Sequence, residues 1–170
     1  AIIATFLMAR VVNYVKKMVR KYFGAEALVG SLRLSHVFYN RYLEFPARQQ
    51  YVNLFTDLME TVIQYQQEDG FWRTSLLDPQ SFPAPESSAT ALFCYGLAWG
   101  LNQGLLEEAR YLPLLEKSWC ALQSCIHPNG MLGWVQLPAF NPRDVKYDHN
   151  MDYGAGAYLL AASEVIKLKI

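Results

Sequence analysis

Apolar residues recur at helical spacing along almost the whole chain. In the clearest segment, residues 47–67, they stand three or four positions apart: Tyr51, Leu54, Phe55, Leu58, Val62 and Tyr65. No segment shows the sustained alternation of apolar and polar residues that is typical of a half-buried strand. The pattern therefore predicts an all-α chain. Its helices are expected at residues 1–22, 26–44, 47–67, 86–102, about 111–125 and about 152–168.

Two connections between these helices are unusually long, at residues 68–85 and 126–151. Loops of this length are usually functional or disordered. The first contains the run "GFWRTSLLDPQSFPAPESS", which is too apolar and aromatic for a disordered segment. We therefore expect it to be ordered and functional.

The two loops begin with similar sequences. "QYQQEDGFW" (64–72) follows the third expected helix, and "QSCIHPNGMLGW" (123–134) follows the fifth. Gly70 and Gly130 are sixty residues apart, and each motif ends in a tryptophan. Such a period indicates that a helical hairpin is the repeating unit, stacked in a solenoid or closed into an α/α barrel. Both loops are then expected on one rim.

The composition indicates a single globular domain over residues 1–170. The chain is 52% hydrophobic and 18% charged, which excludes a disordered protein. Its formal net charge is zero, but residues 1–50 carry eight Lys and Arg against two Glu. This imbalance indicates either a basic face for an acidic partner or ordinary solvated helix surfaces. Neither nucleic acid nor a membrane is expected as a partner.

The three cysteines, Cys94, Cys120 and Cys125, do not have the spacing of metal ligands. We expect free thiols in a reducing compartment, and therefore a cytoplasmic protein. The opening "AIIATFLMAR" lacks the basic segment and cleavage site of a signal peptide, and its apolar run is too short to span a bilayer. His127 and His149 have no second His or Cys at ligand spacing, so no metal is expected.

Trp72 and Trp134 are candidate substrate-binding residues, because an indole face can stack on a sugar ring. The alternative is that each tryptophan fills the end of its own hairpin. If the rim is a sugar cavity, Trp72 is expected to be partly exposed within it.

Glu86, Ser87 and Ser88 stand where the fourth helix is expected to begin. Either serine could cap this helix, and Glu86 would be favoured by the helix dipole. In the functional interpretation, Glu86 and Ser87 face a cavity and hold a polyol, with Glu86 partly exposed.

Arg73 could bind a substrate carboxylate in bidentate fashion, or it could pair with Asp69 or Asp78 as part of the loop. The acids available in the loops are Asp78, Glu86, Asp148 and Asp152.

Residues 48–168 resemble the C-terminal half of unsaturated rhamnogalacturonyl and glucuronyl hydrolases. The similarity lies in "LMETVIQYQQEDGFWRTSLLDPQSFPAPESSATALFCYGLAWGLNQGLL", "YLPLLEKSWCALQSCIHPNGMLGWVQ" and "YGAGAYLLAASEV". The resemblance implies six helical hairpins in an α/α barrel. It also implies hydrolysis of a Δ4,5-unsaturated uronic acid from an oligosaccharide left by a polysaccharide lyase, with an Asp as acid/base and no cofactor.

The family's catalytic Asp and its Arg-Gly-Asn-Gly-Trp run have no counterpart here. Ala4, in "IATFLMARVV", stands roughly where the Asp would be, and residues 29–36 read "VGSLRLSH". No catalytic residue is therefore assigned. The positions that carry over are cavity-lining candidates: Trp72, Arg73, Glu86, Ser87 and Trp134.

Six helices are half of the twelve that such a barrel requires. The chain is therefore expected to be inactive on its own and to self-associate or bind a missing N-terminal half. The alternative function is a non-catalytic α/α-repeat module that binds carbohydrate or another protein.

Overall fold

The computed structural model describes residues 48–138 and 142–170. Its elements are α3 (Arg48–Val62), the 3-10 helix η1 (Ile63–Tyr65), α4 (Ser87–Asn102), α5 (Glu108–Ser124) and α6 (Asp152–Leu168). Over these two ranges there is no strand, only an isolated bridge between Ile126 and Leu132. The all-α prediction is confirmed. The helices expected within residues 1–44 lie outside the described residues.

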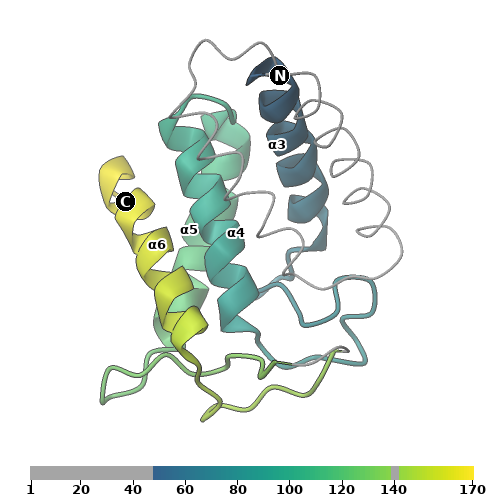
Figure 1. Ribbon diagram of the computed structural model, residues 1–170, viewed down its shortest axis with the longest axis vertical. Helices are drawn as coiled ribbons and strands as arrows, with labels where there is room; N and C mark the ends of the chain where they lie inside the picture. Colours follow the sequence, from purple (N-terminus) through teal and green to yellow (C-terminus); the bar gives the residue numbers. More distant parts are fainter. Residues whose placement is uncertain (1–47, 139–141) are drawn as a thin grey trace, which may run out of the picture.

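α4 is the central helix of the described region, with α3, α5 and α6 around it (Figure 1). Thirteen of its sixteen residues are buried, so it is apolar all round, as a helix enclosed by others must be. Aromatic pairs connect these helices. Phe55 of α3 meets Trp99 of α4 edge-on at 4.9 Å, and Trp119 of α5 stacks on Tyr158 of α6 at 5.1 Å.

Both long loops lie at the same end of the bundle, the lower end in Figure 1. The predicted repeat is confirmed by the turn that opens each loop, at residues 67–71 and 127–131. In both, the first N–H donates to the fifth carbonyl (2.9 and 2.8 Å), and the fourth N–H donates to the first carbonyl (3.0 and 2.8 Å). The fourth residue is a glycine with φ of +88° or +85°. The third, Asp69 or Asn129, accepts the fifth N–H with its side chain.

This register corrects the expected equivalence of the two tryptophans. Trp72 follows the first turn directly, and the residue at that place after the second turn is Leu132. Both are buried, at 0% and 8% exposure. Trp134 lies two positions further on and is only half-buried. The two indoles therefore occupy different environments despite their similar motifs.

Cys94, Cys120 and Cys125 are all free. Burial raises the pKa of the Cys94 and Cys125 thiols to about 12, whereas Cys120 is exposed. In the part of the chain that the structure describes, no helix is both long enough and apolar enough to cross a membrane.

Candidate functional site

The two rim loops meet at the N-terminus of α4, and the Glu86 carboxylate connects them. Its Oε1 accepts the Ser88 N–H (3.1 Å) and the Ser88 hydroxyl (2.7 Å), and its Oε2 accepts the Ala89 N–H (2.6 Å). Oε1 also accepts the N–H of Gln136, from the second loop, at 3.0 Å. Glu86 therefore caps α4 and holds the second loop against it.

This arrangement corrects two expectations. The helix cap is Glu86 rather than either serine, because α4 begins at Ser87 and the carboxylate reaches the first free N–H groups. Glu86 is also 3% exposed rather than partly exposed. Four donors contact its two oxygens, three of them at Oε1. Glu86 is thus suited to positioning the loops.

Ser87 also holds the second loop against the start of α4. Its hydroxyl donates to the Gly133 carbonyl at 2.7 Å, and its N–H donates to the Trp134 carbonyl at 2.8 Å. Ser87 is fully buried, so these bonds are shielded from water. A hydroxyl already committed in this way does not face a substrate, contrary to the functional interpretation of its sequence position.

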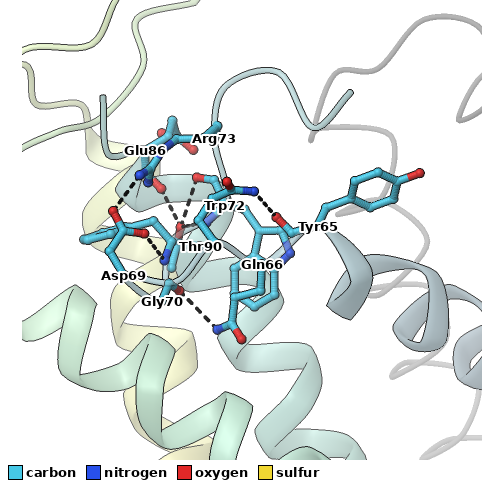
Figure 2. Close-up of polar contacts among 10 residues, drawn as sticks. Tyr65, Gln66, Asp69, Gly70, Trp72, Arg73, Glu86 and Thr90 are labelled. Atoms are coloured by element: carbon cyan, nitrogen blue, oxygen red, sulfur yellow. Dashed lines mark hydrogen bonds and ion pairs between the residues drawn. The ribbon is translucent and has the colours of Figure 1, made fainter. Parts of the chain in front are cut away.

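Trp72 fills the end of the hairpin between α3 and α4. Its side chain is 0% exposed, its indole N–H donates to the Val62 carbonyl at 2.8 Å, and its ring meets Phe93 edge-on at 5.2 Å. Its backbone N–H donates to the Thr90 hydroxyl at 3.1 Å (Figure 2). The expectation that Trp72 is partly exposed is therefore wrong. Trp72 instead fills the end of its own hairpin, which was the alternative expected from the sequence.

Arg73 pairs with Asp69, one of the two partners expected from the sequence. The distance between Arg73 Nη2 and Asp69 Oδ2 is 2.5 Å, and the Arg73 side chain is 12% exposed (Figure 2). Its other terminal nitrogen, Nη1, is buried and has no hydrogen-bond partner among the described residues. Asp78 instead accepts the Ser81 N–H within the loop. Arg73 is thus engaged with Asp69 in the loop, and its remaining terminal nitrogen is shielded from solvent.

Trp134 has an unusual backbone conformation, with φ of +59°. Such values are rare for bulky residues and persist where neighbouring contacts impose them. Here the Trp134 N–H donates to the Tyr147 carbonyl and its own carbonyl accepts from Ser87. Its ring meets the Tyr147 ring edge-on at 5.9 Å. Of the expected site residues, Trp134 is the aromatic one whose side chain is partly exposed at the rim.

Three residues of the site were not singled out from the sequence: Thr90, Gln136 and Tyr147. Thr90 and Gln136 act through hydrogen bonds to distant parts of the chain, which no local pattern encodes. Tyr147 lies in a segment without periodicity.

The loop acids Asp78, Asp148 and Asp152 are all exposed. The described residues contain no cluster of three or more side chains that could hold a metal ion.

These features define a class of protein: helical hairpins whose connecting loops are joined into an ordered rim at one end. Residues 42–169 match the model of Glycosyl Hydrolase Family 88, and the chain belongs to this family. The chain is 40% identical over 126 residues to an unsaturated 3S-rhamnoglycuronyl hydrolase of Formosa agariphila, and 39% identical over 121 residues to one of an Alteromonas species. These alignments cover 74% and 71% of this chain.

Among solved structures, a glycosyl hydrolase family 88 protein from Bacteroides vulgatus superposes with a TM-score of 0.79 at 33% identity, over 86% of this chain. The described helices are therefore hairpins of an α/α barrel, as the resemblance implied. The chain spans only 33% and 29% of the two curated relatives and 44% of the solved chain.

Proposed function

We propose that this chain is part of a glycoside hydrolase that removes a Δ4,5-unsaturated uronic acid from an oligosaccharide left by a polysaccharide lyase. The observation that carries the proposal is the match to two unsaturated 3S-rhamnoglycuronyl hydrolases at about 40% identity. The family match over residues 42–169 extends through both rim loops, so it includes site residues as well as core positions. By this analogy, the sugar next to the uronide is a rhamnose.

The proposed reaction needs an acid/base group and no cofactor. A carboxylic acid protonates C4 of the vinyl ether and water adds at C5, which gives an unstable hydrate that opens and releases the neighbouring sugar. Proton transfer of this kind contributes about 10²–10⁴-fold when the group lies within hydrogen-bond reach. Glu86 is poorly suited to this role because its oxygens are occupied. Ala4, which stands roughly where the family's Asp would be, has no acidic group and lies outside the described residues. The acid/base therefore belongs to the part of a family-length barrel that this chain does not match.

We expect the 170-residue chain alone to show no turnover of an unsaturated rhamnoglycuronyl disaccharide. A chimera in which residues 48–168 replace the matching third of the Formosa relative should be active. Turnover would be followed as loss of the ultraviolet absorbance of the conjugated double bond. The unaltered relative is the control for the assay.

Turnover of the disaccharide by the 170-residue chain at an ordinary enzyme rate would contradict the placement of the acid/base outside this chain. Asp148 and Asp152 would then be the first acids to replace. A chimera that folds but does not turn over the disaccharide would contradict the proposed activity. If that chimera still bound the disaccharide, the alternative of a non-catalytic carbohydrate-binding module would be favoured.

The outer face of α6 indicates what this part of the barrel contacts. We call Leu159 and Ile166 the α6 face; they are 67% and 75% exposed and lie seven positions apart, which places them on one side of the helix. Apolar side chains gathered in this way mark an interaction surface. More than half of the solved family chain lies outside the superposed region. We propose that the α6 face packs against helices from that remaining part.

Without those helices, the chain is expected to self-associate through the α6 face. Size-exclusion chromatography with light scattering should give a mass above 19.4 kDa for the 170-residue chain. The double variant Leu159→Glu/Ile166→Glu should elute as a monomer. Leu77→Glu, at a site on the first loop that is 58% exposed, is the matched control and should leave the association unchanged. A monomeric wild-type chain would contradict the proposal. We also propose a reducing, cytoplasmic location, for which the free thiols are the supporting observation.

A further inference from the structure

An aromatic stack in the second rim loop is not used by the interactions described so far. His127 lies flat against Tyr147, with ring centroids 3.7 Å apart and an interplanar angle of 16°. Trp134 covers the edge of the same tyrosine ring. Tyr147 is nevertheless 46% exposed. Because one face is covered by His127 and one edge by Trp134, the exposed area lies mainly on the opposite face.

The position of this ring is fixed by its backbone. The Tyr147 carbonyl accepts the Trp134 N–H at 3.3 Å and the His127 Nε2 at 2.8 Å. A carbonyl only accepts, so His127 carries its proton on Nε2. The close approach requires Gly133, where an added Cβ would lie 2.2 Å from the Tyr147 carbonyl oxygen and 2.3 Å from His127 Nε2. The ring is thus held in place before any ligand arrives, which lowers the entropy cost of binding.

We infer that the open face of Tyr147 is a binding platform for the neutral sugar that follows the unsaturated uronide. A flat aromatic face attracts the C–H groups of a pyranose ring and offers nothing to a carboxylate. Only the identity of the sugars rests on the proposed function; the platform itself does not.

Methyl α-L-rhamnopyranoside tests the platform directly. The full 170-residue chain, labelled on its tyrosine rings, would be titrated with this neutral probe and followed by NMR. The Tyr147 signal is identified by its loss in Tyr147→Phe. We expect it to shift on addition of the probe, while the other tyrosine signals move less. The absence of a Tyr147 shift at saturating probe would overturn the inference.

Affinity for an unsaturated rhamnoglycuronyl disaccharide provides the second test, measured on the active chimera described above. Tyr147→Ala should weaken binding about threefold to tenfold, the range expected for one aromatic stack. Tyr147→Phe retains the ring and should bind within about 1.5-fold of wild type. Gly133→Ala retains the tyrosine but displaces it, and should resemble Tyr147→Ala. Glu116→Ala, at an exposed position of α5, is the control and should have no effect.

Equal affinity for Tyr147→Ala and wild type would overturn the platform while leaving the proposed function intact. Equal losses in Tyr147→Phe and Tyr147→Ala would also overturn it, because the hydroxyl rather than the ring face would then carry the binding. Conversely, a Tyr147 shift with the rhamnoside, together with a folded chimera that never turns over the disaccharide, would support the platform and contradict the proposed function.

Discussion

Trp72→Ala should lower the free energy of unfolding by about 3–5 kcal/mol, the cost of removing a large aromatic side chain from a packed core. The side chain is fully buried against Phe93, so its loss leaves a cavity. The change also leaves the Val62 carbonyl without the indole N–H that it accepts. Urea unfolding followed by circular dichroism measures the effect. Natural domains are stable by only about 5–15 kcal/mol, so this variant should be close to unfolding.

Trp72→Phe separates the two contributions to this loss. It preserves much of the packing but not the hydrogen bond to Val62, so an intermediate loss is expected. Leu77→Ala is the control in the same loop; Leu77 is 58% exposed, and the change should stay within about 0.5 kcal/mol. If Trp72→Ala were as stable as wild type yet failed to bind the disaccharide, Trp72 would belong to the sugar site after all.

Glu86→Ala should lower the free energy of unfolding by about 2–4 kcal/mol. The change removes the cap of α4, which alone is worth about 0.5–2 kcal/mol. It also leaves the N–H of Gln136, which is part-buried, without its acceptor, and such a group costs about 1–3 kcal/mol. Urea unfolding again provides the measurement, with hydrogen exchange at the Gln136 amide as a local readout of the contact between the loops.

Glu86→Gln tests whether the two carboxylate oxygens are both needed. A glutamine supplies one oxygen, so its NH₂ group would face one of the donor N–H groups, and an intermediate loss of stability is expected. Asp152→Asn is the matched control, because Asp152 is an exposed acid in the first turn of α6. A Glu86→Gln protein as stable as wild type, with a protected Gln136 amide, would contradict the bridging role.

Much of the fold was predictable because helix formation leaves a periodic signal in the sequence. The bounds expected for the last helix, 152–168, are those observed for α6. The position of both loops on one rim followed from the repeated motif, since a repeated turn places both loops at the same end of their hairpins. α5 begins at Glu108, earlier than the predicted 111, because the apolar stripe does not mark the polar first turn of a helix.

The environment of the candidate site residues was harder to predict. Trp72 and Trp134 have the same side chain in similar motifs, and only the three-dimensional register shows that one is buried and the other is not. The capping role of Glu86 was missed because short hydroxyl side chains dominate at this position, so Ser87 and Ser88 were preferred. The contact between Glu86 and Gln136 joins residues fifty positions apart, a distance at which local patterns give no information.

The left-handed backbone at Trp134 has a consequence for protein engineering. A glycine would adopt this conformation without the penalty of about 1–2 kcal/mol that other residues incur, so design methods that score stability alone would favour replacing the tryptophan. Such a replacement would delete the indole that borders Tyr147. A more thermostable version of this chain should therefore be sought on helix surfaces, and position 134 should be left unchanged even where a stability score recommends otherwise.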